Sequence, residues 1–108
     1  AWSDFLPAWM RIAEMAVVIG SERDVEGLRA VDVLRDLDGK RQYPEPELYA
    51  GEIWARRAKV GGADAADATR RARTALERFL GRARGAGEAQ GRNVARAERL
   101  LRELEGGR

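Results

Sequence analysis

The chain of 108 residues is 44% hydrophobic and 35% charged, and this length and composition predict one soluble globular domain. The formal net charge of +2 hides a polarity, because residues 1–54 hold 6 Lys/Arg against 11 Asp/Glu (net −5) and residues 55–108 hold 14 against 7 (net +7). The sequence has no Cys and no His, which excludes disulfides, Ser-His-Asp or Cys-His catalysis and the usual zinc sites. No metal ion or other cofactor is expected.

The first two predicted helices form a hairpin. Apolar residues recur at a helical period from Asp4 to Ile19, and further apolar residues widen this stripe until it nearly encircles the helix. A helix that is apolar on nearly every side is covered on more than one side, so we expect it to lie centrally in the domain or in an interface. Gly20 ends it, and a second helix follows from Val25 to about Leu37.

A loop and a second predicted hairpin follow. The loop spans residues 38–46, and the third helix covers Glu47 to Val60, where Glu52 and Arg56 have the spacing of a favourable i,i+4 ion pair. A Gly-Gly pair ends this helix. The fourth helix starts near residue 64 and reaches residue 80 or slightly beyond, with small alanines first and larger apolar residues at its far end.

Four glycines between Gly81 and Gly91 predict the end of the fourth helix and a flexible connection. The last segment carries apolar residues at 3-4-3 spacing, which is the seam of an amphipathic helix. No alternating β-branched run predicts a strand. The fold class is therefore all-α within a single domain, 1–108: five helices, arranged as two stacked hairpins (about 4–38 and 47–84) plus a C-terminal amphipathic helix (about 92–105).

The fourth segment resembles the second helix of a tetratricopeptide repeat. That family places a small residue seven positions before an Ala-Leu pair, as Ala68 and Ala75-Leu76 do here. The resemblance covers about fifteen residues and implies a stack of helical hairpins that binds other proteins. Arg56 and Lys59 depart from the family's first-helix pattern, and the period of about 40 residues is longer than the usual 34. A compact four- or five-helix bundle remains the alternative.

Arginines dominate the C-terminal half, and those singled out as a basic partner-binding face are Arg71, Arg78, Arg82, Arg96 and Arg99. Arg78 and Arg82 form a like-charge i,i+4 pair, which an anionic partner would relieve. Such a partner is either an acidic protein surface or a phosphate backbone. No aromatic residue is interleaved with the arginines of this face. The same pattern also fits a merely solvated face.

The candidate apolar contacts to a partner are Trp2, Trp9, Leu101 and Leu104. Tryptophan is favoured where interfaces concentrate their binding energy, although Trp9 also fits simple packing inside the domain.

Two carboxylate pairs, Glu45/Glu47 and Asp64/Asp67, fit helix starts, where acids complement the helix dipole. The third pair, Asp36/Asp38, does not share a helix face because its members are two residues apart. We therefore expect that the protein is not an enzyme.

The sequence predicts a non-catalytic helical protein–protein interaction module, either an adaptor or a self-associating protein. A small nucleic-acid-associated protein that uses the same arginine face is the alternative. The longest apolar run is far too short to span a bilayer, and a bias toward Ala, Arg and Gly is typical of a GC-rich bacterium. A cytoplasmic, bacterial protein without a membrane partner is the expectation.

Overall fold

The computed structural model describes residues 5–39, 43–85 and 90–106, and within these ranges it contains helices and no strands. The prediction of an all-α fold with five helices is confirmed. The elements are α1 (Phe5–Ile19), the short 3-10 turn η2 (Ser21–Arg23), α2 (Asp24–Leu37), α3 (Glu45–Val60), α4 (Ala65–Ala83) and α5 (Gly91–Gly106). Within the described part of the chain, no helix is long and apolar enough to cross a membrane.

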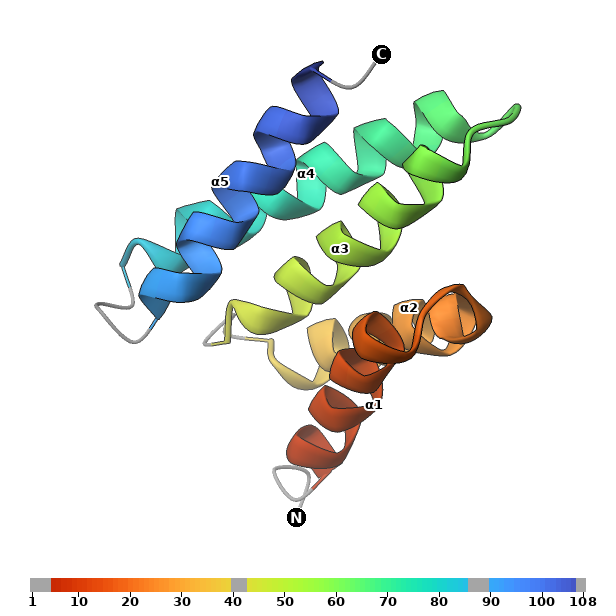
Figure 1. The fold of residues 1–108 in the computed structure, drawn as a ribbon. Helices are drawn as coiled ribbons and strands as arrows, with labels where there is room; N and C mark the ends of the chain where they lie inside the picture. The colour runs from red at the N-terminus through yellow and green to blue at the C-terminus, as the bar shows by residue number, and fades with distance from the viewer. Residues whose placement is uncertain (1–4, 40–42, 86–89, 107–108) are drawn as a thin grey trace.

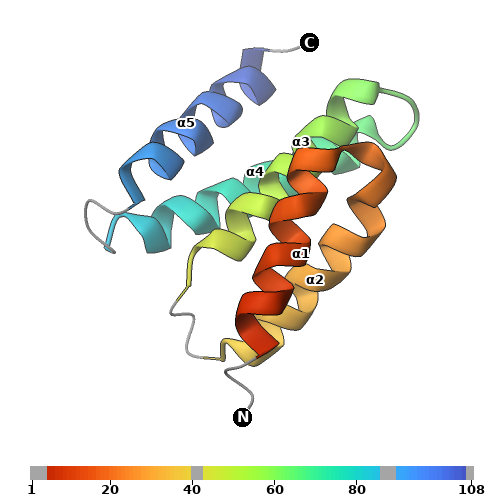
Figure 2. The same ribbon diagram turned by 60° about the horizontal axis from the view of Figure 1, so that its bottom comes forward.

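The helices form two stacked hairpins and one further helix (Figure 1). Helices α1 and α2 pair with each other, as do α3 and α4. Helix α3 packs on both α1 and α2, and α5 packs on both α3 and α4. In each case, a helix packs on both helices of the hairpin that precedes it. Figure 2 shows the two hairpins side by side, with α1 in front of α2.

The hydrophobic core has two parts that meet at Trp54 of α3. The first part lies between the hairpins, and the second lies where α5 covers α3 and α4. Trp54 is half-buried and packs against both. The fully buried large apolar side chains of these parts are Val31, Leu34, Leu76 and Phe79.

Two buried glycines allow neighbouring helices to approach closely. A Cβ atom built on Gly27 of α2 would lie 2.5 Å from the Ala16 Cβ atom and 2.8 Å from the Ile53 Cδ1 atom. A Cβ atom built on Gly51 of α3 would lie 2.5 Å from a methyl group of Leu76. Both distances are shorter than a real Cβ atom would make, so a side chain at either glycine would force its neighbours to shift where α2 meets α1 and α3 and where α3 meets α4.

The predicted end of the fourth helix, at residue 80 or slightly beyond, agrees with the observed end of α4 at Ala83. Helix α4 continues through Gly81 to Ala83, because Leu80 and Ala83 are both buried and the packing of these residues outweighs the low helix propensity of one glycine. Gly91, also predicted to lie in the connection, is the first residue of α5.

The local ion pair predicted between Glu52 and Arg56 is replaced by contacts between elements. Arg56 donates hydrogen bonds to the carbonyl oxygens of Val17 (2.9 Å) and Ala16 (3.2 Å) and forms an ion pair with the buried Asp24. Glu52 pairs instead with Arg96 of α5. Arg56 therefore connects α3 to α1 and α2, whereas Glu52 connects α3 to α5.

Candidate partner-binding cleft

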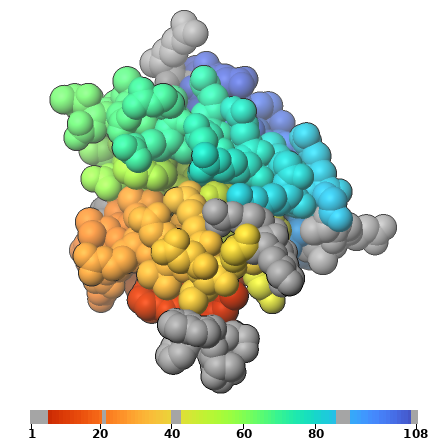
Figure 3. Space-filling view, turned by 180° about the vertical axis from the view of Figure 1, so that it is seen from behind, coloured from red at the N-terminus to blue at the C-terminus, as the bar shows by residue number. Residues whose placement is uncertain are grey.

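A cleft of about 340 Å³ opens where α2, α3 and α4 meet. Figure 3 views the side of the molecule on which α2 (orange to yellow) lies beside α4 (green to teal). Helix α2 contributes Arg35 and α3 contributes Trp54, while α4 contributes Arg70, Arg71, Thr74, Ala75 and Arg78. We call this site the arginine cleft.

Two arginine side chains stack on the indole ring of Trp54. The guanidinium carbon of Arg71 lies 5.1 Å from the centroid of the indole ring, and that of Arg57 lies 5.3 Å from it. Cations at this range are attracted by the aromatic ring. Stacking also restrains the long Arg71 side chain before any partner arrives, so less conformational entropy is lost on binding.

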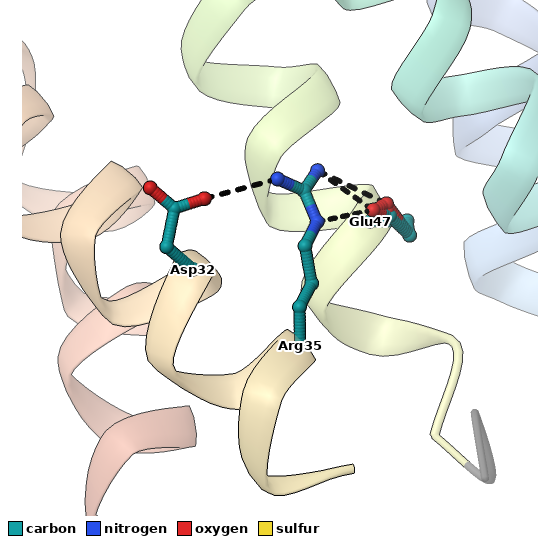
Figure 4. A network of polar contacts seen from close by, with 3 residues as sticks. All are labelled: Asp32, Arg35 and Glu47. Carbon is teal, nitrogen blue, oxygen red and sulfur yellow. Dashed lines mark hydrogen bonds and ion pairs between the residues drawn. The ribbon is translucent and has the colours of Figure 1, made fainter. Parts of the chain in front are cut away.

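Arg35 forms one wall of the cleft and is fixed by two carboxylates (Figure 4). Its Nε atom donates to Glu47 Oε1 at 2.8 Å, and its Nη1 atom donates to Asp32 Oδ1 at 3.1 Å. Glu47 is only 1% exposed, and a buried carboxylate requires such a partner. Arg35 therefore neutralises Glu47 and holds α2 against α3.

The arginines on α4 are only partly neutralised. Asp67 accepts a hydrogen bond from Arg71 Nε at 2.8 Å and also pairs with Arg70. The hydrogen bond from Arg71 lowers the pKa of the Asp67 carboxyl, assisted by the positive charges of Arg71 and Arg70. Arg78 has no carboxylate within ion-pair distance among the described residues. It is the cation of the cleft that an anionic partner would satisfy.

The fold divides the five arginines predicted to form one face. Arg71 and Arg78 line the cleft together. Arg82 is half-buried one turn further along α4, and Arg99 is exposed on α5. Arg96 lies elsewhere, paired with Glu52 in a hollow that residues of α1, α3 and α5 line.

The apolar candidates pack largely against the chain itself. Trp9 is half-buried against the core between the hairpins, and Leu101 and Leu104 are partly buried against the core beneath α5. Leu104 also lines a small hollow of about 110 Å³ between α3, α4 and α5. Trp2 lies outside the described residues.

The sequence did not reveal the cleft as a site. The cleft residues Arg35 and Trp54 were not predicted, because they belong to α2 and α3 whereas the sequence pattern indicates a basic face on α4 and α5. Their spacing in the sequence carries no signal of their proximity. No aromatic residue is interleaved with the arginines along the chain, but in space Trp54 of α3 lies beneath Arg71.

Comparison with known proteins gives no match to a protein-family model, to a curated protein or to a solved structure. Among the described residues, no group of three or more acidic side chains is arranged to hold a metal ion. The proposed function therefore rests on the geometry of the cleft.

Proposed function

We propose that the protein is a non-catalytic helical interaction module that binds an acidic segment of a partner protein in the arginine cleft. The observation that carries this proposal is the placement of Arg71 over Trp54 next to Arg78, for which the described residues supply no carboxylate. The tetratricopeptide-like pattern of α4 supports a module of this kind.

The chemistry of the cleft suits carboxylates. A guanidinium group presents several donors in a plane and binds a carboxylate through two parallel hydrogen bonds. Arg78 offers such a fork in the lining of the cleft, while Arg71 is already oriented by the indole ring. An incoming Glu or Asp would join Asp67 in neutralising the arginines of α4.

Nucleic acid is the second candidate, and one observation favours it. Trp54 supplies an aromatic surface within a group of arginines, and such groups bind single-stranded nucleic acids through phosphate contacts and stacking. Against this, Trp54 is half-buried and already carries two arginines, so little of its ring is open to a base. An acidic peptide requires no stacking and is the better fit.

The test compares a charge-reversed cleft with a matched control. The Arg71→Glu/Arg78→Glu double variant should bind a fluorescent Glu/Asp-rich peptide at least tenfold more weakly than the wild type, because it replaces two cationic donors of the cleft with negative charges that repel the peptide. The Arg92→Glu/Arg102→Glu variant changes the net charge equally on the exposed side of α5 and should bind almost as the wild type does. Fluorescence anisotropy gives the affinities, and circular dichroism verifies the helical content.

Two results would contradict the proposal. An equal loss in both variants would mean that diffuse charge, rather than the cleft, attracts the peptide. Binding of single-stranded DNA with a steep salt dependence, without comparable binding of the peptide, would favour the second candidate.

A further inference from the structure

A hollow of about 490 Å³ lies between the N-terminal parts of α1 and α3 and shares no lining residue with the arginine cleft. Its residues come from these two helices and from the segment just before α3. They are Leu6, Pro7, Met10, Arg11, Glu14, Tyr43, Glu45 and Tyr49. The lining thus combines two carboxylates with two phenol rings and an apolar part.

The two carboxylates of the hollow form no ion pair with any described residue. Glu14 Oε2 lies 3.5 Å from the Tyr49 hydroxyl, and Glu45 Oε1 is shielded from solvent without a donor among the described residues. Burial, followed by the negative charges of Glu14 and Glu45, raises the pKa of Tyr49. Both carboxylates therefore act on the same side of one phenol ring, and shielded carboxylates of this kind favour a cationic partner.

Arg11 also lines the hollow but does not neutralise these carboxylates. It forms no ion pair within the described chain. It also lines a separate hollow with Ile12 and Ile19, so it lies at the rim between the two. With one positive charge from Arg11 and two negative charges from Glu14 and Glu45, the lining has a net charge of −1. One further cation would balance it.

The same side of α3 already holds an arginine further along the helix. Glu45, Tyr49 and Glu52 are spaced by four and three residues, which places them on one side of α3. Arg96 of α5 forms an ion pair with Glu52 in an adjacent hollow of about 480 Å³. That hollow shares Glu14 and Tyr49 with the first, so the two join into one groove. A groove of this length accommodates an extended segment rather than a single small cation.

We propose that the hollow between α1 and α3 binds an arginine side chain from a basic segment of a partner protein. The guanidinium group lies against the Tyr49 ring and donates to Glu14 and Glu45, since its edge offers several N–H donors and its face stacks on aromatic rings. Leu6 and Met10 receive an apolar neighbour of that arginine.

The arginine cleft contains an example of this arrangement within the chain. There, the Arg71 guanidinium carbon lies 5.1 Å from the centroid of the Trp54 ring, and Arg71 Nε donates to Asp67 at 2.8 Å. An aromatic ring and a carboxylate therefore hold one guanidinium group on this fold. The hollow between α1 and α3 presents the same two kinds of group, and the partner supplies the guanidinium.

This proposal is independent of the proposed function of the arginine cleft. The Glu14→Gln/Glu45→Gln variant changes only the hollow between α1 and α3, so it should bind the Glu/Asp-rich peptide at least as tightly as the wild type does. Loss of binding in one site leaves the other intact, and the two proposals can fail separately.

Fluorescence anisotropy with a labelled Leu-Arg-Leu peptide flanked by Gly and Ser tests the hollow. The Glu14→Gln/Glu45→Gln variant should bind this peptide at least tenfold more weakly than the wild type, because both acceptors lose their charge. The Glu77→Gln/Glu105→Gln control removes the same charge at exposed positions of α4 and α5 and should bind as the wild type does. A peptide with citrulline in place of arginine, which keeps the shape without the charge, should bind the wild type at least tenfold more weakly.

A second variant protects the test against a change in folding, because Glu45 is partly buried. Glu14→Gln alone, at an exposed position, should weaken binding at least threefold, and circular dichroism verifies the helical content. An equal loss in both double variants, or equal binding of the arginine and citrulline peptides, would overturn the proposal. Self-association of the wild type at millimolar concentration, abolished by Glu14→Gln/Glu45→Gln and without peptide binding, would also overturn it, because the arginine would then come from a second copy.

Discussion

At the scale of single residues, Tyr49 shows how the fold changes the chemistry of a side chain. Tyr49 lies on α3 beside α1, and its hydroxyl points toward Glu14 Oε2 at 3.5 Å. Burial, followed by the negative charges of Glu14 and Glu45, raises the pKa of Tyr49 from 10.0 to about 12. The neutral phenol is thus favoured in the folded chain.

This shift predicts a loss of stability at high pH. The folded pKa of Tyr49 exceeds the unfolded value, so the stabilising contribution is complete below pH 10 and is lost as the pH rises toward 12. Titration of tyrosinate absorbance in a Tyr43→Phe background, which leaves Tyr49 as the sole tyrosine, should give this raised pKa. Adding Glu14→Gln should lower the pKa. An unchanged value would mean that the Glu14 charge does not act on the phenol.

At the scale of helices, Gly27 and Gly51 decide how closely the elements pack. Helix propensity alone would favour alanine at both positions. The space is already occupied, by Ala16 and Ile53 at Gly27 and by Leu76 at Gly51. Packing between helices therefore outweighs propensity within them.

Two glycine-to-alanine substitutions should consequently have opposite effects. Gly27→Ala should lower the free energy of unfolding by about 1–2 kcal/mol, because overpacking exceeds the gain in propensity. Gly81→Ala should raise the free energy of unfolding by about 0.5–1 kcal/mol, since Gly81 lies within α4 and has open space around its Cα atom. Urea denaturation measures both. Stabilisation by Gly27→Ala would show that the helices can move apart at little cost.

The helices were predictable because periodic apolar residues report which side of a helix is buried. The segments found in the sequence match the observed elements closely, including the end of α4 shortly after residue 80. The cleft was less predictable, since its arginines and Trp54 come from three helices. The sequence placed Arg71 and Arg78 on one side of α4, but only the fold shows that Arg35 faces them across the gap.

At the scale of the whole molecule, the two hairpins are linked by charged as well as apolar contacts. Trp54 packs against both parts of the core. Arg56 joins α3 to Asp24 and to the end of α1. The hairpins should therefore unfold together.

Arg56→Met should lower the free energy of unfolding by about 3 kcal/mol, because Asp24 would remain buried without its charged partner. Arg73→Met, at an exposed position of α4, is the control and should change the free energy of unfolding by at most about 0.5 kcal/mol. Addition of Asp24→Asn to Arg56→Met should recover part of the loss. Urea titrations followed by tryptophan fluorescence and by circular dichroism should coincide for the wild type, and separate transitions would contradict the linkage.

The contact of Arg56 with Ala16 and Val17 also stabilises the end of a distant helix. Carbonyl groups in the last turn of a helix lack partners within that helix, and near the end of α1 a side chain 39 and 40 residues further along the chain supplies donors. The C-terminal end of α1 is thus stabilised in part by a side chain of α3. In a nascent chain, α1 can begin to coil early, but the donors of Arg56 reach its last turn only after α3 has emerged and docked.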